Sequence, residues 1–564
     1  MATRHAGERT GGNAGAGTGR RRGRVRGPRA RRARIAPVAL AALPAAFIGV
    51  FFLYPLVGVL VRSFDAGVLL ATWRNPVTTD VLWFTTWQAL ASTGLCLVAA
   101  LPTAAVLARL RFRGRRLVHA LLVVPFVLPT VVVAAAFLSL MDRFGLADRF
   151  HHTVWAILAA HVFFNYAIIA RSVAAYWSQL DPAPEQAAAV LGASPLRVFG
   201  AVTLPRLAPA VGAVTAIVFL FNFTSFGVIL ILGGPRRATL DTEIWRFAVQ
   251  RLEFDTAAAL ALLQLLCVLL LVVGATLWQR RRQVAERLRT DTARRVRGAA
   301  DRVLLAGTLG VASAVVGLPL AMLVERSLRS GGTYTLENYR RLGESSERLQ
   351  ALFVSPLAAI RHSLEFAATA TVIATIGGLL VAVAVSGRRK RGAAALEGAF
   401  LMPLGTSAVI LGFGMLLVLD SPPLDLRLSW WLVPIAHALI GMPFVIRSVT
   451  PALAAVSPRL REAAATLGAR PARVKREVDL PLALRGLAVG AGFAFAVSLG
   501  EFGATAFVVR PERPTVPIAI FRLLGRPGEA AFGQAMAMSV ILLVMAAAAV
   551  LLIDRLRPAG AADF

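Results

Sequence analysis

A few polar side chains interrupt the long apolar stretches of this sequence of 564 residues. Glu501 and Ser225 stand inside such stretches, and they coincide when the sequence is shifted by 276 residues along itself. An ionisable side chain in an apolar stretch commonly faces a cavity or a polar partner. Glu501 therefore has two interpretations: it lines a pathway and favours a cation, or it is a buried glutamate hydrogen-bonded between helices. The residues predicted to line a pathway are Asn222, Ser225, Glu501 and Thr505.

Two histidines, His161 and His437, also coincide under this shift and lie within apolar stretches. A relay for metal ions is one interpretation, but a packed and hydrogen-bonded histidine is favoured because no second ligand is visible nearby. The sequence contains no evident set of paired acids, no nucleophile with a base and no phosphate-binding Gly-x-x-x-x-Gly-Lys-Ser/Thr pattern. We therefore predict no catalytic residue, no metal site and no cofactor in this chain.

The composition indicates what class of protein must position these residues. Hydrophobic residues make up 57% of the chain, charged residues make up 16%, and the mean hydropathy is +0.68. Apolar stretches of about 20 residues, each long enough to cross a bilayer, recur along the whole chain. This pattern excludes a soluble fold and predicts an all-α polytopic membrane protein with about 12 spans. The predicted spans are 35–62, 82–108, 117–141, 153–170, 207–233, 256–278, 303–325, 362–386, 393–417, 430–448, 484–509 and 530–553.

The formal net charge of +31 is concentrated in short basic clusters between the apolar stretches. The clusters at 109–116, 280–282 and 388–391 follow predicted spans of even number, as expected for cytoplasmic loops when the amino terminus is cytoplasmic. Topology therefore accounts for the charge, and nucleic-acid binding is not expected. Residues 1–34 are predicted to form a disordered basic tail before an uncleaved first span. We expect a multi-pass protein of the bacterial inner (plasma) membrane with both termini in the cytoplasm.

The shift of 276 residues reveals an internal repeat. Polar, glycine and proline positions stay in register over about a hundred residues, which chance similarity between apolar segments would not achieve. Equivalent points are an even number of spans apart, so the two halves share one orientation and form parallel repeats of six helices. The predicted divisions are the tail 1–34, a first half 35–278, a cytoplasmic linker 279–302 and a second half 303–564.

One long loop recurs between the fourth and fifth spans of each half, at about 180–206 and 456–482. Asp181 and Ser457 are predicted helix caps, each followed by proline and an alanine-rich turn that strongly favours helix. A glycine then ends the first helix, and a Leu-Pro pair is expected to end a second short helix before the next span. Loops of this length are commonly functional, and the recurrence favours a function over a mere connection.

These loops resemble the EAA loop of ABC importer permeases, in which Glu-Ala-Ala is followed three residues later by Gly and later by Leu-Pro. The second loop fits this pattern directly, whereas the first has Gln186 at the glutamate position with Glu185 just before it. The resemblance implies a fused two-half, type I ABC importer permease in which each loop is a coupling helix seated in a groove of an ATPase subunit. The implied docking residues are Glu185, Gln186, Ala187, Ala188, Gly192, Leu204 and Pro205 in the first loop and Glu462, Ala463, Ala464, Gly468, Leu480 and Pro481 in the second.

The resemblance also implies the partners and the substrate class. The partners would be two copies of a cytoplasmic ABC ATPase, which uses ATP and Mg²⁺, an extracytoplasmic solute-binding protein and the lipid bilayer. The stretches 223–227, 232–234 and 498–505 are similar to fused permeases of thiamine and ferric-iron importers, and the last is also similar to molybdate and sulfate permeases. Ferric iron or thiamine is therefore the implied solute.

Two other functions are alternatives to this interpretation. A secondary transporter of the major facilitator type also has twelve spans in two parallel halves, but its basic loop between spans two and three usually includes an acid, which 109–116 lacks. A membrane-embedded enzyme is opposed by the missing catalytic constellations.

Overall fold

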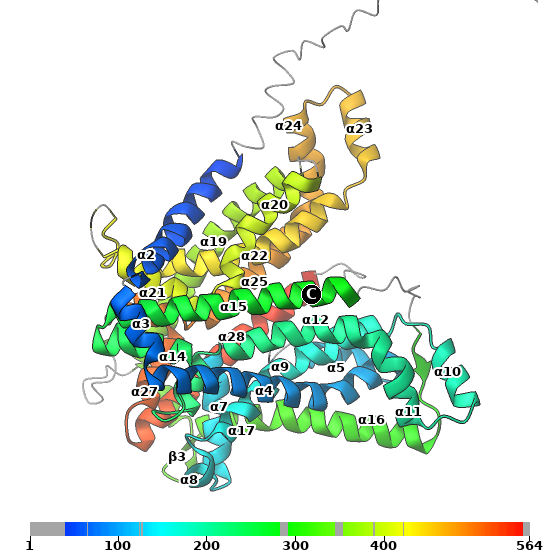
Figure 1. The fold of residues 1–564 in the computed structure, drawn as a ribbon, viewed down its shortest axis with the longest axis horizontal. Coiled ribbons are helices and arrows are strands. Elements are labelled where there is room, and N and C mark those ends of the chain that lie inside the picture. The colour runs from blue at the N-terminus through cyan, green and yellow to red at the C-terminus, as the bar shows by residue number, and fades with distance from the viewer. Residues whose placement is uncertain are drawn as a thin grey trace, which may run out of the picture.

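The computed structural model describes residues 40–64, 66–122, 125, 128–282, 292–343, 353–386, 390–420, 422 and 424–556, which are mostly helical (Figure 1). The predicted tail 1–34 and residues 283–291 of the predicted linker lie outside the described residues. Strand β1 (Leu110–Arg111) pairs in parallel with β2 (Arg294–Arg295), which fixes the end of the linker beside the second span. Strands β3 (Arg329–Ser330) and β4 (Thr333–Tyr334) form an antiparallel pair.

The helices follow the order expected from the repeat. The first half contains η1 (Gly49–Leu53), α2 (Tyr54–Ser63), α3 (Ala66–Arg74), α4 (Pro76–Arg109), α5 (Arg115–Leu121), α7 (Thr130–Arg143), α8 (Ala147–Phe150), α9 (Val154–Trp177), α10 (Ala183–Val190), α11 (Pro195–Val198), η2 (Phe199–Thr203), α12 (Leu204–Phe223), α13 (Gly227–Leu232), α14 (Leu240–Trp245), η3 (Arg246–Arg251) and α15 (Phe254–Arg282). The second half contains α16 (Gly298–Ala312), η4 (Ser313–Gly317), α17 (Leu318–Ser327), α18 (Glu337–Arg340), η5 (Arg341–Gly343), α19 (Pro356–Ser386), α20 (Lys390–Leu401), η7 (Met402–Gly405), α21 (Ala408–Val418), α22 (Leu432–Ala454), α23 (Pro458–Thr466), α24 (Pro471–Val474), η8 (Lys475–Asp479), α25 (Leu480–Gly500), α26 (Thr505–Val508), α27 (Val516–Leu524) and α28 (Glu529–Leu556).

The described part of the chain has ten helices that are long and apolar enough to cross a membrane, or eleven if one bent pair counts as a span. The difference from the predicted 12 lies in the third span of each half. In the first half α5 and α7 are separate helices, and in the second Ala395–Gly405 and Ala408–Val418 meet at 89°. Pro129 precedes α7, and the hydroxyl of Ser407 accepts a hydrogen bond from the Val409 N–H at the start of α21. Proline and a capping serine each favour a new helix start, so the apolar stretch is interrupted.

The fifth span of each half ends earlier than predicted. Helix α12 ends at Phe223 and α25 at Gly500, and the short helices α13 and α26 follow after a break. In the second half the Glu501 carboxylate explains the break, because its Oε1 accepts a hydrogen bond from the Ala504 N–H at 2.7 Å. The backbone of Glu501 is itself extended, with φ of −67° and ψ of 125°, so the preceding helix ends there.

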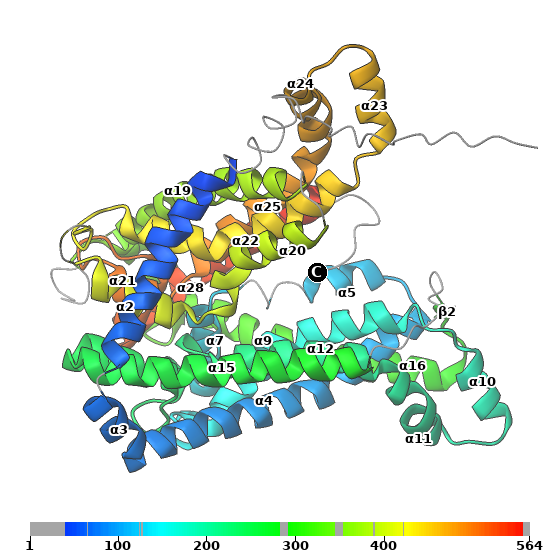
Figure 2. The ribbon, with the colours of Figure 1, turned by 45° about the horizontal axis from the view of Figure 1, so that its top comes forward.

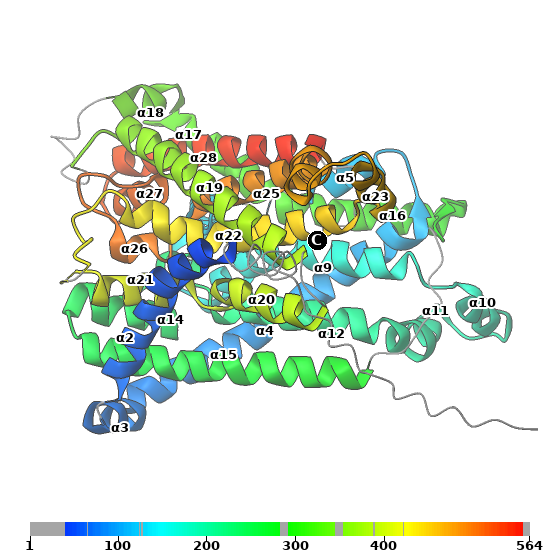
Figure 3. The same ribbon diagram turned by 90° about the horizontal axis from the view of Figure 1, so that it is seen from above.

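The first span of each half packs against the opposite half. Helix α2 contacts α21 (Figure 2), and α17 contacts α28 (Figure 3) as well as α7. The α2–α21 crossing is close, because a Cβ atom on Gly58 would clash with Val418 Cγ1. A buried polar contact also joins the halves: Asp241 Oδ1 accepts hydrogen bonds from Gln264 Nε2 at 2.9 Å and from Ser407 Oγ at 2.7 Å. The broken helix of the second half is therefore tied to the first half.

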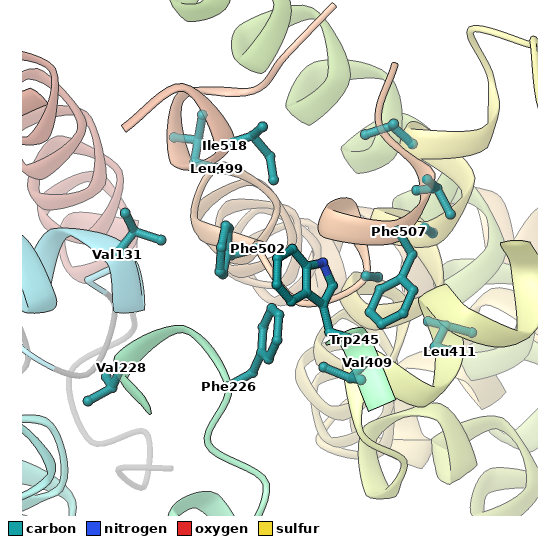
Figure 4. Packing of buried hydrophobic residues seen from close by; sticks show 14 of the residues in the cluster. Val131, Phe226, Val228, Trp245, Val409, Leu411, Leu499, Phe502, Phe507 and Ile518 are labelled. Carbon is teal, nitrogen blue, oxygen red and sulfur yellow. The ribbon is translucent and has the colours of Figure 1, made fainter. Parts of the chain in front are cut away.

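Four aromatic rings meet where the halves join. Phe226 and Phe502, which are equivalent in the repeat, stack with ring centroids 5.3 Å apart and planes at 25° (Figure 4). Trp245 and Phe521, another equivalent pair, meet edge to face at 6.0 Å. Each phenylalanine also contacts the ring of its own half, Phe226 with Trp245 and Phe502 with Phe521. Stacked and edge-to-face rings are both favourable geometries, so the four rings form one packed unit, the aromatic junction.

A glycine in α21 provides a test of the inter-element packing. A Cβ atom on Gly412 would lie 2.7 Å from the Cα and carbonyl oxygen of Ala504, whereas one on Gly310 in α16 would meet nothing within 4 Å. We expect Gly412→Ala to lower the unfolding midpoint of the solubilised protein, since overpacking costs about 1–3 kcal/mol. Gly310→Ala should leave it unchanged or raise it, because alanine favours helix by about 1 kcal/mol over glycine. Equal midpoints for the two variants would contradict this packing.

Candidate functional site

The two recurring loops have the same backbone turn. In the first loop the Ala193 N–H bonds the Ala188 carbonyl at 3.1 Å and the Gly192 N–H bonds the Ala189 carbonyl at 3.0 Å. The second loop repeats both bonds through Ala469 and Gly468, and both glycines have φ of +83°. This bonding is the Schellman arrangement, which ends a helix in a left-handed residue and favours glycine there. The predicted role of the glycines as helix terminators is therefore explained by geometry.

The start and end of each loop differ in part from expectation. Asp181 Oδ1 accepts a hydrogen bond from the Ala183 N–H, whereas Ser457 makes no such side-chain bond at its cap. The Leu-Pro pairs do not end a helix: continuous helices run from Pro195 to Phe223 and from Pro471 to Gly500. Each pair follows a five-residue π-helical turn, η2 or η8. Because proline lacks an N–H, this wider turn accommodates the missing bond and the helix continues.

Glu185 anchors the first loop. Its Oε1 pairs with Arg109 Nη2 at 2.8 Å and accepts a hydrogen bond from Thr203 Oγ1 at 3.1 Å. Arg109 also donates to the carbonyl of Leu180 at 3.2 Å and to the Thr292 hydroxyl at 2.8 Å. One arginine at the end of α4 therefore holds both the first loop and the linker.

The equivalent positions of the second loop are also in contact, but there they form an ion pair. Arg461 is equivalent to Glu185 and Asp479 to Thr203, and Arg461 Nε bonds Asp479 Oδ1 at 2.7 Å. Arg461 also donates to the Leu453 carbonyl at 2.8 Å. Glu185 is therefore a loop anchor and not a displaced motif glutamate. The motif position itself, Gln186 or Glu462, is exposed in both loops.

Apolar side chains that are not among the predicted docking residues project from the loops. Val190 and Leu191 beside the first glycine are 86% and 87% exposed, and Leu196 is 84% exposed. Leu467, equivalent to Leu191, is 88% exposed. Clustered exposed apolar side chains mark a surface that another molecule covers. The sequence signal that would have found them is a large apolar residue directly before a helix-ending glycine.

The in-membrane histidines are held by hydroxyl groups in both halves. The ring nitrogens of His161 lie 2.9 Å from Ser92 Oγ and 2.9 Å from Ser225 Oγ. Those of His437 lie 2.7 Å from Ser498 Oγ and 2.8 Å from Thr505 Oγ1. No group of three or more His, Cys, Asp or Glu side chains within the described residues is arranged to hold a metal ion. The arrangement favours the packed, hydrogen-bonded interpretation of both histidines.

Glu501 combines both of its predicted interpretations. Its carboxylate accepts hydrogen bonds from the N–H groups of Ala504 and Thr505 and from the Thr505 hydroxyl, and it lies 3.3 Å from His437 Nε2. The residue is only 7% exposed, yet it lines a cavity of about 330 Å³ between the halves. Of the four predicted pathway residues, Asn222, Ser225 and Glu501 line this cavity, while Thr505 contacts it only through Glu501.

The other cavity walls come from both halves. Asn222 is fully buried, and it receives a hydrogen bond from Asn165 at 2.9 Å and donates one to Thr93 Oγ1 at 3.1 Å. Phe226 and Phe502 of the aromatic junction line the cavity. The two loops lie at the far ends of two groups of helices that diverge from the junction (Figures 1 and 2). The cavity therefore lies beside the aromatic junction, from which the helices diverge toward the loops.

Comparison with known protein families accounts for this geometry. The model of the binding-protein-dependent transport system inner membrane component family matches residues 97–283 and 374–559. The chain belongs to this family. It is the membrane permease of an ABC importer, with the family domain present twice, and the matched segments end 276 residues apart, as the repeat requires.

The permease is similar over most of its length to two bacterial transport proteins. It is 28% identical over 516 residues to the thiamine transport system permease protein of Brucella abortus, covering 87% of this chain and 90% of the relative. The thiamine transport system permease protein of Escherichia coli is 26% identical over 488 residues, covering 81% and 85%. The molybdenum transport system permease protein of Mycobacterium bovis is 34% identical over 243 residues, covering 41% of this permease and 91% of the relative. This last relative has the length of one half.

The anchor of the second loop can be tested by exchanging its charges. Asp479→Arg places two like charges together and should speed hydrogen exchange of the α23 amides, by up to about fivefold if the partly exposed pair contributes about 1 kcal/mol. The double exchange Arg461→Asp with Asp479→Arg should restore the slower exchange. As a control, Arg473→Asp alters a more exposed pair with Glu477 and should change α23 little. Failure of the double exchange to restore protection would contradict the assignment.

Proposed function

We propose that this permease moves thiamine across the bacterial inner membrane, driven by two copies of a cytoplasmic ABC ATPase. Each ATPase subunit docks on one loop, about 180–206 or 456–482, and uses ATP and Mg²⁺. An extracytoplasmic binding protein delivers the solute at the opposite face, and both chain termini lie in the cytoplasm. The observation that carries this proposal is the pair of loops with one shared turn and exposed apolar tips, each joined by one long helix to the aromatic junction.

The geometry supports alternating access. The helices diverge toward the loops and meet at the aromatic junction, which corresponds to a state open toward the cytoplasm (Figure 1). Closure of an ATP-bound dimer would bring the loops together and open the junction. ATP and the loaded binding protein shift this equilibrium only as far as they bind one state more tightly than the other.

Thiamine is favoured over ferric iron as the solute. Relatives that cover more than four fifths of the chain are named as thiamine permeases. The in-membrane histidines are occupied by hydroxyl partners, so they offer no support for a metal relay. No specific observation favours a secondary transporter or a membrane-embedded enzyme.

The docking assignment predicts a site-specific effect of strain at the loop glycine. We expect Gly468→Val to reduce copurification of the ATPase at least about fivefold, because forcing a side chain into the left-handed region costs about 1–2 kcal/mol and distorts the turn. Gly528→Val is the matched control: Gly528 also has a positive φ, of +112°, and open space around it, but it lies before α28 and away from the loops. If both variants retain the ATPase, or both lose it, the docking role of the loop is wrong.

Transport itself is tested with the complete importer in liposomes. Purified permease, ATPase and binding protein should together accumulate labelled thiamine only when ATP and Mg²⁺ are present. Uptake should continue when a protonophore removes the proton gradient. Uptake that depends on the gradient and persists without ATP would indicate a secondary transporter, and uptake of ferric iron without thiamine would overturn the substrate.

A further inference from the structure

The lining of the central cavity combines one carboxylate with several aromatic rings. Among the described residues that line the cavity, Glu501 is the single one with a formally charged side chain. The remaining walls include six phenylalanine rings, from both halves: Phe164, Phe221, Phe226, Phe444, Phe493 and Phe502. The face of an aromatic ring carries negative partial charge and attracts cations, by about 0.5–2 kcal/mol depending on desolvation. The carboxylate and the rings therefore favour the same sign of ligand charge.

The carboxylate does not depend on a ligand to be satisfied. Three hydrogen-bond donors from Ala504 and Thr505 hold Glu501, and His437 Nε2 lies 3.3 Å away. Its Oε1 lies 3.6 Å from where a Cβ atom on Gly503 would stand, and Gly503 lines the cavity. The negative charge is therefore fixed at the cavity wall and acts through its field, while few of its lone pairs remain for direct coordination.

This arrangement distinguishes between kinds of cation. A small hard metal ion needs several oxygen or nitrogen ligands in place of its water shell. An organic cation with spread charge exchanges weakly held water for aromatic faces at little cost. The rings of Phe444 and Phe493 stand together on α22 and α25, with centroids 6.2 Å apart and planes at 25°. Thr224 and Ser225, in the other half, supply hydroxyl groups to the cavity.

We infer that the cavity is a binding site in the permease itself for an organic cation of low charge density, recognised by the Phe444–Phe493 pair and the fixed charge of Glu501. The volume of about 330 Å³ lies within the range of small-molecule sites. The inference rests on the proposed function, because the thiazolium ring of thiamine is such a cation and its aminopyrimidine ring can use the polar groups. Selection is thus made twice, once by the binding protein and once inside the membrane.

The test measures binding without the binding protein. The permease with its ATPase is placed in lipid nanodiscs, and equilibrium dialysis gives the Kd for thiamine, for tetraethylammonium and for the uncharged hydroxymethylpyrimidine that corresponds to half of thiamine. The double variant Phe444→Leu with Phe493→Leu keeps apolar bulk but removes both aromatic faces. We expect it to raise the Kd for both cations about tenfold and to change that for the neutral pyrimidine less than twofold.

A matched control is Phe413→Leu. Phe413 is fully buried and contacts Phe507 with centroids 6.3 Å apart, but it does not line the cavity. This variant should leave all three Kd values unchanged. Equal Kd values for the double variant and the wild type, or an equal loss for the neutral pyrimidine, would overturn the cation site.

Thiamine transport and the cation site inside the permease can be tested independently. If the complete importer takes up thiamine but the double variant binds and transports it as the wild type does, the in-membrane site is wrong and the function stands. If the importer takes up no thiamine but tetraethylammonium binds in a manner that depends on Phe444 and Phe493, the substrate is wrong and the cation site stands. Glu501→Gln, with its unfolding midpoint measured alongside, should weaken both cations in the same direction as the double variant.

Discussion

The contact on which the structure depends is the stacking of Phe226 on Phe502, the same position of the repeat meeting its copy from the other half. Trp245 and Phe521 close around this contact in the same paired way. Because Phe226 and Phe502 each lie in the segment directly after a long helix, the junction fixes where those two helices converge beside the cavity. A contact between two non-equivalent positions would not couple the halves equally, because each position would have different neighbours.

The duplicated halves keep their geometry while their chemistry diverges. The position of Glu185 in the first loop is Arg461 in the second, and Thr203 corresponds to Asp479, yet the pair of positions remains in contact. Ser225 and Glu501 show the same behaviour in the membrane, where each lies near the equivalent histidine. Equivalent positions therefore keep their contact, while the residue types that make it change. The sign of the charge is free to change, and this freedom gives the cavity one carboxylate and not two.

Much of the architecture follows from sequence patterns because single strong effects determine it. Hydropathy places the long helices, and proline, alanine and glycine place the loops. Hydropathy alone failed to place the breaks before Thr130 and Ala408, because a broken apolar helix is as apolar as a straight one. It also gave no indication of Phe444 and Phe493: in a chain that is 57% hydrophobic, a phenylalanine that lines a cavity has the same local signature as one in the core. The anchoring role of Glu185 required its distant partner Arg109, which no local pattern specifies.

In each half, a single continuous helix connects the loop to the aromatic junction. The helix that begins at Pro195, directly after the first loop's turn, runs unbroken to Phe223, and Phe226 follows three residues later. The helix from Pro471 to Gly500 leads in the same way to Phe502. Helices of 29 and 30 residues are about 43–45 Å long, so each connects its loop to the aromatic junction as one rod. A tilt imposed on the loops must therefore reach the stacked rings directly. The π-helical turns keep the rods continuous past their Leu-Pro pairs, so a true helix end at Leu204 or Leu480 would have separated ATPase docking from the junction.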